Sequence, residues 1–371
     1  MPTTAYSSHF GCELDVRQLL ARAGYARDMT ETPIELTSEQ KAWIRQDVLC
    51  PSCGVSGAIV IREAHQAGTG RKVGQAHFRF PPGAEQLTDA HRPGCEFHEG
   101  DPAPPALIGE LVSFGAAKTN DTRLIRLLVC KAIAARVFSQ ADIRAMRQWY
   151  FERNTGGQQF VMQADVGHVE RAWALARFRG TTPPLAFLPI HATLPLFRWP
   201  RAAARQLAHE FGSTFDALRG FHGATTRDAV KRLARTYFGH TLPRTAQLDD
   251  AYARTLEVAS IANDYGGLRL SGRTGYPDAL LALSALLVHV AGGDTAGALA
   301  RFSAILAAPE PGDLSLGNVM GLNPFRDYLA LGHAERISEL AQAGALDIDL
   351  DATLVATEQR LRATFQASGL T

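Results

Sequence analysis

Apolar residues recur every three to four positions over most of the chain beyond residue 106, a period typical of amphipathic helices. Helices are predicted to follow the capping signals at Asn120 and Ser139, and Gly, Pro or Asp stands at nearly every later junction. The predicted helical ranges are 120–137, 139–153, 168–178, 200–211, 225–238, 245–264, 277–291, 294–307, 324–343 and 350–367. The pairs 277–291 with 294–307 and 324–343 with 350–367 resemble antiparallel hairpins, so we predict a C-terminal helical bundle or short helical array.

The first hundred residues follow a different pattern. An amphipathic helix is predicted over 9–24, and a second one follows the capping signal Thr37-Ser38-Glu39-Gln40. The β-branched run 58–61 and the alternating apolar residues of 75–80 indicate two paired strands. The predicted fold class is therefore mostly α, with a small α+β module at the N-terminus.

A proline-rich stretch separates these two patterns. A chain of 371 residues is long for one core, so more than one domain is expected. Prolines in Asp101-Pro102-Ala103-Pro104-Pro105 exclude a helix and favour an extended spacer. We predict an N-terminal module over 1–101, a linker over 102–106 and a helical domain over 107–371, and the prolines leave open a further division near 181–200.

Three of the five cysteines lie within the predicted N-terminal module, with the spacing of metal ligands. Cys50 and Cys53 form a C-x-x-C pair, and Cys95 and His98 repeat the same spacing about 40 residues later. Thiolate and imidazole are the ligands that Zn²⁺ prefers, and four of them close its tetrahedral shell. The spacing therefore predicts a structural Zn²⁺ bound by these four residues, because no position remains for a catalytic water.

Other histidines compete for the fourth position. His77, within the second predicted strand, is the main alternative to His98, and it could instead support the ligands from outside the shell. His91 is a weaker candidate and His65 is weaker still. The alternative chemistry for Cys50 and Cys53 is a redox pair or two reduced core thiols.

The same segment resembles a known family. Cys50-Pro51-Ser52-Cys53-Gly54, a β-like segment, His77-Phe78 and the C-x-x-H ending at His98 resemble the N-terminal zinc module of competence protein CoiA-like bacterial proteins, over Val48 to Asp101. The family's His-Phe-Ala-His motif is matched only at His77-Phe78, because Arg and Phe follow. The resemblance implies a DNA-processing role in competence or mobile elements, where many relatives are suspected of carrying a nuclease domain.

Composition narrows the class of protein. Apolar residues make up 46% and charged residues 20% of the chain, which is ordinary for a folded protein. No apolar run reaches the ~18 residues of a membrane span, and the first residues lack the basic-then-apolar order of a signal peptide. We therefore expect a cytoplasmic protein without membrane association, in a compartment that keeps thiols reduced.

A formal net charge of +1 confines any nucleic-acid site to a local patch. Basic residues gather at helical spacing, some beside Trp149, Tyr150 and Phe151, as expected of a surface that holds phosphates and stacks bases. They can equally coat the solvent side of amphipathic helices. The candidates are Arg123, Arg126, Lys131, Arg144, Arg147, Arg227, Lys231 and Arg235.

No motif in the helical part identifies a reaction. A restriction-type nuclease needs Pro-Asp followed by Asp/Glu-x-Lys, but after Pro277-Asp278 no lysine follows, because Lys231 is the last in the chain. Phosphate-binding glycine loops are also missing. The hypothesis is a zinc-containing bacterial protein that binds nucleic acid or a protein partner in competence, mobile-element or phage-defence biology, without catalysis. A divergent metal-dependent nuclease and a helical interaction scaffold are the alternatives, and the oligomeric state stays open.

Overall fold

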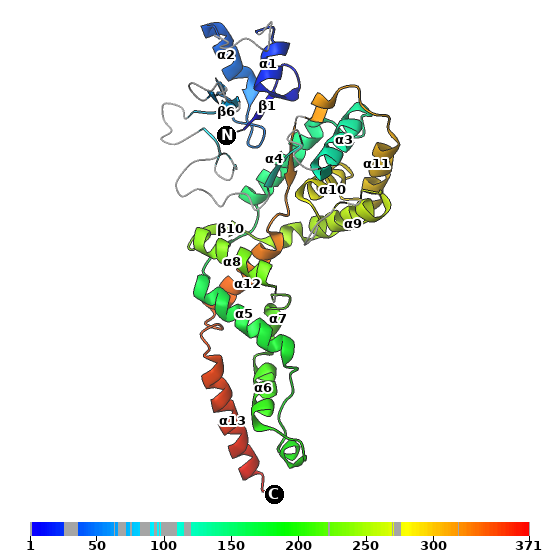
Figure 1. Ribbon diagram of the computed structural model, residues 1–371. Coiled ribbons are helices and arrows are strands. Elements are labelled where there is room, and N and C mark those ends of the chain that lie inside the picture. The colour runs from blue at the N-terminus through cyan, green and yellow to red at the C-terminus, as the bar shows by residue number, and fades with distance from the viewer. Residues whose placement is uncertain are drawn as a thin grey trace. The chain divides into compact units, whose positions relative to one another are not determined.

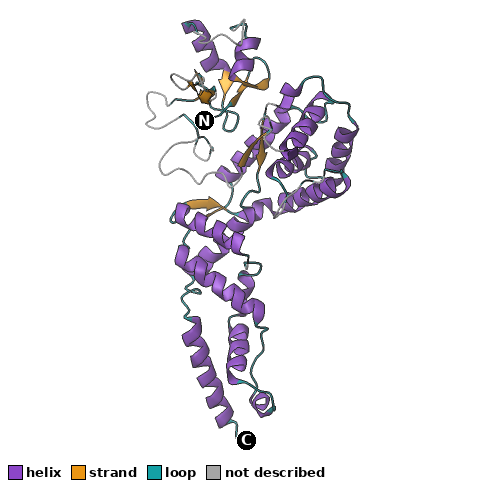
Figure 2. Cartoon of the chain, viewed as in Figure 1, coloured by secondary structure: helices purple, strands orange, loops and turns teal. Residues whose placement is uncertain are grey.

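Helices dominate the fold (Figure 2), which confirms the predicted mostly α class with a small α+β N-terminal part. The computed structural model describes residues 2–25, 36–62, 64–65, 72–74, 76–81, 90–92, 95, 97, 110–114, 120–221, 223–268, 270, 276–317 and 319–370. The chain divides into two compact units, each made of two chain segments: unit 1 is Met1–Gln158 with Ala246–Arg326, and unit 2 is Gln159–Thr245 with Asp327–Thr371. The predicted linker 102–106 lies outside the described residues, and 181–200 falls inside unit 2.

Unit 1 combines the small strands with one group of helices (Figure 1). Its N-terminal elements are β1 (Thr4–Ser7), β2 (Cys12–Asp15), α1 (Val16–Arg22), α2 (Ser38–Asp47), β3 (Val48–Leu49), β4 (Ile59–Ile61), β5 (Ala64–His65), β6 (Lys72–Gly74), β7 (His77–Arg79) and β8 (Glu110–Ser113). Its other elements are α3 (Asn120–Ala134), α4 (Gln140–Gly156), α9 (Asp249–Tyr265), α10 (Asp278–Val290), α11 (Thr295–Ala307), the 3₁₀ helix η3 (Leu314–Gly317) and β11 (Met320–Asn323).

Helices make up most of the described part of unit 2. Its elements are β9 (Gln159–Val161), α5 (Val166–Thr181), the 3₁₀ helix η1 (Pro189–Thr193), α6 (Trp199–Glu210), α7 (Gly212–Ala217), α8 (Ala224–Tyr237), β10 (Thr241–Pro243), α12 (Tyr328–Gln342) and α13 (Leu350–Ala367), and the 3₁₀ helix η2 (Thr245–Leu248) follows β10 in the chain.

The N-terminal sheet corrects one predicted helix. Strands β2, β1 and β3 form an antiparallel sheet in that order, with Thr4 opposite Asp15 and Ser7 opposite Cys12. The helix predicted over 9–24 therefore begins only at Val16, where the Asp15 carboxylate accepts a hydrogen bond of 2.8 Å from the Gln18 amide. Glu13 lies on β2 and is buried, where its carboxylate contacts Arg147 and Met320. These contacts with distant parts of the chain favour the strand over the locally predicted helix.

The predicted strand pair is present. β4 and β7 are antiparallel, with Ile59 opposite Arg79 and Ile61 opposite His77. Phe78, at 0% exposure, turns into the core that lies between this pair and the three-stranded sheet. That core also includes Phe151 of α4, so the N-terminal strands and α4 share one apolar interior.

Helix α10 is the central element of the helical part of unit 1. Nearly all of its residues from Ala279 to Val288 are buried, and it packs against α9, α11 and β11. Among the described residues, no single helix has the length and apolar content to cross a membrane, although α10 and α11 reach them together across a bend of 118°. That bend also means that the predicted hairpin of 277–291 and 294–307 is not an antiparallel pair.

Unit 2 shows a further difference from the predicted hairpins. Helix α13 packs chiefly against α6 rather than against α12 (Figure 1). Arg360 of α13 donates two hydrogen bonds of 2.7 and 2.8 Å to the Glu210 carboxylate at the end of α6. Helix α12 packs instead on α8 and α5. Sequence neighbours are therefore not spatial neighbours here.

Candidate metal centre

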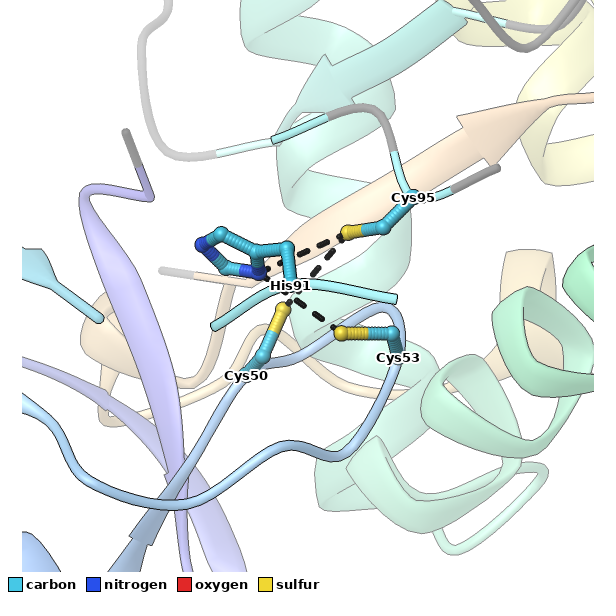
Figure 3. Close-up of side chains that lie close together, drawn as sticks. All are labelled: Cys50, Cys53, His91 and Cys95. Atoms are coloured by element: carbon cyan, nitrogen blue, oxygen red, sulfur yellow. Dashed lines mark hydrogen bonds between the residues drawn. The ribbon is translucent and has the colours of Figure 1, made fainter. Parts of the chain in front are cut away.

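Four side chains converge in unit 1 on one small volume (Figure 3). The sulfurs of Cys50, Cys53 and Cys95 and a ring nitrogen of His91 all lie within 4.8 Å of one another. The cysteines are at most 3% exposed and the histidine is 7% exposed. Such a group of three thiols and one imidazole can hold a metal ion.

The first two ligands lie on a tight turn that follows β3. The Cys50 amide donates to the Val55 carbonyl at 2.8 Å, and the Gly54 amide donates back to the Cys50 carbonyl at 3.1 Å. Gly54 has a φ of +72°, a conformation that side chains disfavour and glycine adopts freely. Because the turn folds back on itself, the sulfurs of Cys50 and Cys53 point to the same side.

The other two ligands come from a segment beyond β7. The Ala90 amide donates to the Phe80 carbonyl at 3.5 Å, which anchors the start of this segment. The His91 ring stands edge-on to the Phe80 ring, with 5.1 Å between centroids, and lies 5.7 Å from the ring of Phe97. Aromatic packing therefore orients the imidazole toward the cysteines.

Three of the six separations between the candidate ligand atoms are between 3.6 and 4.0 Å. Nδ1 of His91 lies 3.6 Å from the sulfur of Cys53 and 3.6 Å from that of Cys95. The sulfurs of Cys50 and Cys95 are 4.0 Å apart. These are the contacts drawn as dashed lines in Figure 3. No disulfide joins the three cysteines, which are all free thiols.

Burial makes three thiolates at this point costly without a cation. Burial, together with contacts to the other two thiols, raises the pKa of Cys50 well above its ordinary value. The pKa of Cys95 rises to about 12, because a hydrogen bond with Cys50, which lowers it, is outweighed by the contact with Cys53 and by burial. Hydrogen bonds from Cys50 and Cys95 lower the pKa of Cys53. The site thus favours one thiolate, and a bound cation would stabilise the other two.

The structure brings together three of the four predicted ligands, with His91 as the fourth member. His98 lies outside the described residues. His77 lies on β7 opposite Ile61 and does not belong to the converging group, and the side chain of His65 is not described. Matching C-x-x-C and C-x-x-H spacings placed His98 first, whereas the four-residue separation of His91 from Cys95 offered a weaker local signal.

The candidate nucleic-acid-binding residues on α3 and α4 differ in exposure and in their contacts with the rest of the protein. Arg123 is exposed, and Lys131 is half-buried near the end of α3. The Arg126 guanidinium donates to the Leu314 carbonyl at 3.0 Å. Arg144 stacks on the Tyr6 ring, with 3.9 Å from Cζ to the centroid. The side chains of Arg126 and Arg144 are therefore held by contacts within unit 1.

One of the candidates is not a surface residue. Arg147 is 2% exposed, and its guanidinium contacts both carboxylate oxygens of Glu13 and donates to the Met320 carbonyl. A phosphate cannot reach a guanidinium that is buried and paired with a carboxylate in this way. Helical spacing suggested that Arg147 belongs to a basic surface, but in the structure it lies on the interior side of α4.

The basic candidates on α8 lie beside acidic groups. Lys231 forms an ion pair of 2.5 Å with Glu170 of α5. Arg227 lies 3.8 Å from the same carboxylate and stacks on Trp173, with 4.4 Å from Cζ to the ring centroid. Arg235 is exposed at the other end of the helix. Glu170 therefore offsets much of the positive charge of this face.

Comparison of the chain with protein-family models, with curated proteins and with solved structures finds no match. The functional reading therefore rests on the geometry and chemistry of the molecule.

Proposed function

We propose that Cys50, Cys53, His91 and Cys95 bind one structural Zn²⁺. The observation that carries the proposal is the set of ligand separations, 3.6, 3.6 and 4.0 Å. A tetrahedral ion with bonds of about 2.3 Å to sulfur and about 2.0 Å to nitrogen places its ligands about 3.8 Å apart for two sulfurs and about 3.5 Å apart for sulfur and nitrogen. These three separations are close to those that such an ion requires, which supports the proposal.

Burial and ligand number support a structural role. Four protein ligands complete a tetrahedral shell, so no position stays open for a water or a substrate. The ion would join the turn after β3 to the segment around His91 and Cys95, which are 38 and 45 residues from the ligands they face. Its contribution is to hold these two segments on the core that includes Phe78 and Phe80.

Metal analysis of the purified full chain tests this proposal. We expect one zinc per chain and, after exchange for Co²⁺, the absorption bands of a tetrahedral ion with three thiolate ligands. The variant His91→Ala is expected to lose the metal or change this spectrum, whereas His77→Ala and His98→Ala are expected to keep both. Loss of metal in His98→Ala with retention in His91→Ala would overturn the choice of the fourth ligand, and a metal-free chain after preparation with zinc would overturn the site.

We further propose that the chain is a binding protein whose partner surface lies in unit 2. A groove of about 440 Å³ opens beside η1 and α6. Large apolar side chains border it and stay exposed to an unusual degree: Leu196 by 93%, Leu194 by 59% and Leu185 by 41%. Because burying such a patch is favourable, a contiguous exposed cluster of this kind marks a surface that binds another molecule.

Charge selects the partner that fits this groove. Arg198, Arg201 and Arg205 line it together with the apolar residues. An acidic amphipathic helix supplies both complements: apolar side chains every three to four residues for the groove, and carboxylates for the arginines. The partner class we propose is therefore a protein segment of that kind.

Two helical peptides with the same apolar stripe and opposite charge test the partner class. The acidic peptide is expected to bind the full chain more tightly than the basic one, and Leu196→Asp is expected to abolish the difference. Reversal of charge at Arg198, Arg201 and Arg205 should reverse the preference. Equal binding of both peptides would contradict the proposal. Salt-sensitive binding of single- or double-stranded DNA or RNA in place of the acidic peptide would instead favour the nucleic-acid alternative and direct attention to Arg123 and Arg235.

A further inference from the structure

A second cavity lies in unit 1 and is separate from the metal centre. It has a volume of about 330 Å³ and is lined by α4, α9, α10 and the residues that follow β11. Its size falls at the lower end of the range of small-molecule sites, about 300–1,000 Å³. The walls are mainly apolar, and the side chains that shape it include Met146, Trp149, Thr255, Val288, His289 and Phe325.

One polar group in this wall lacks a partner. The side chain of Thr255 on α9 is 1% exposed, and within the described part of the chain its hydroxyl oxygen makes no hydrogen bond. A threonine inside a helix commonly donates to the carbonyl four residues earlier, which satisfies its hydroxyl. A buried hydroxyl left without a partner is unfavourable unless something else binds it. Because Thr255 lines the cavity, a bound molecule can supply that partner.

Two aromatic rings also line the cavity. The indole of Trp149 and the imidazole of His289 have centroids 5.4 Å apart and planes inclined by 46°. The indole offers a broad apolar face on which a flat molecule can stack. Burial lowers the pKa of His289 against an opposing effect of Asp142, so near neutral pH its uncharged ring can donate at one nitrogen and accept at the other.

We propose that this cavity binds an uncharged, planar heteroaromatic molecule of nucleobase size. The ring system would stack on Trp149, and its nitrogen or carbonyl groups would hydrogen-bond to the Thr255 hydroxyl and the His289 imidazole. A charged ligand fits less well, because the mainly apolar walls would strip its water without replacing it. The few convergent polar groups in an apolar cavity are the usual arrangement of a specific small-molecule site.

Calorimetric titration of the full chain with adenine and with uracil tests this site, and benzene serves as the purely apolar probe. Thr255→Val keeps the shape of the side chain and removes the hydroxyl, so we expect about five- to tenfold weaker binding of the base that the native chain prefers. Ser284→Ala is the matched control: Ser284 is also 1% exposed with an unpartnered hydroxyl, but it lies outside the residues that line the cavity. It should change the affinity less than twofold.

The outcomes separate the possibilities. Weaker binding in Thr255→Val, with native binding in Ser284→Ala and no loss of thermal stability in either variant, supports the proposal. Failure of adenine and uracil to bind at millimolar concentration would overturn the proposal, and the cavity would then be one that holds only water. Equal affinity in the native chain and in Thr255→Val, or binding of benzene alone, would also overturn it, because the hydroxyl would then have no part in recognition.

Discussion

Glu13 on β2 and Arg147 on α4 form an ion pair in the interior of unit 1, with both side chains 1% exposed. One guanidinium nitrogen lies 3.2 Å from a carboxylate oxygen, and the same carboxylate accepts hydrogen bonds from the Thr4 hydroxyl at 2.5 Å and from the Met320 amide at 3.3 Å. Three parts of the chain that are distant in sequence, namely the β1–β2 pair, α4 and β11, therefore meet at one carboxylate. The pair ties the N-terminal sheet to α4 and β11.

Removing one partner of this pair should strongly destabilise unit 1. Arg147→Met leaves the Glu13 carboxylate buried without a cation, and we expect the free energy of unfolding to fall by about 3–5 kcal/mol. Urea unfolding followed by circular dichroism measures this change.

A second variant tests the physical reason. In Glu13→Leu with Arg147→Met, no charge stays buried, so the double variant should be more stable than Arg147→Met alone. Arg144→Ala, on the same helix, removes the contact with the Tyr6 ring, and we expect it to cost about 1 kcal/mol. If Arg147→Met and Arg144→Ala have the same effect, the buried pair does not stabilise the fold.

Loss of a cysteine ligand should release the metal and loosen the N-terminal part of unit 1. Cys95→Ser is expected to lose bound zinc and roughly 4 kcal/mol or more of stability, because the remaining ligands no longer close the shell. Metal content and limited proteolysis within 1–158 check both effects. Cys12→Ser removes a half-buried thiol outside the site and should keep the zinc. Full zinc retention in Cys95→Ser would contradict the site.

The stability of unit 1 should decrease in acid through His289. Burial lowers the pKa of His289 in the folded chain, so the unfolded chain binds the proton more readily. Stability from this group is complete above the unfolded value of about 6.5 and is lost as the pH falls below it, until the folded residue also protonates. We expect His289→Gln to flatten the dependence of the urea midpoint between about pH 7 and pH 5. An unchanged slope would show that other groups cause the acid sensitivity.

Truncation to alanine should affect stability far less at Leu196 than at Leu207. Leu196 is 93% exposed, so Leu196→Ala should change the unfolding free energy by less than about 0.5 kcal/mol. Leu207 on α6 is 0% exposed, and Leu207→Ala should cost about 2–5 kcal/mol by creating a cavity. Thermal melting compares the two. A large loss in Leu196→Ala would mean that this leucine supports the fold rather than a partner surface.

Local sequence signals predicted several features correctly. The capping signals at Thr37 and Ser139 are capping boxes in the structure, with reciprocal bonds to Gln40 and Asp142. The two predicted strands pair as β4 and β7. Each of these signals depends on residues close together in the chain or on a simple alternation of apolar residues. Such local features depend little on the rest of the fold.

The sequence by itself also indicated the three thiols of the candidate metal centre, since Cys50 and Cys53 form a C-x-x-C pair and Cys95 supplies a third thiol. Only the tertiary structure decided that His91 joins them, because ring packing against Phe80 brings its imidazole to the thiols across 38 residues.

The tertiary structure also decided whether Arg147 lies at the surface or in the interior. Helical spacing shows that it shares a face with other residues, but not whether that face meets solvent or the carboxylate of Glu13, 134 residues away. Likewise α13 packs chiefly on α6 rather than on its neighbour α12. Periodicity fixes which side of an element is apolar, whereas the partner of that side depends on how all the elements together bury their apolar surface.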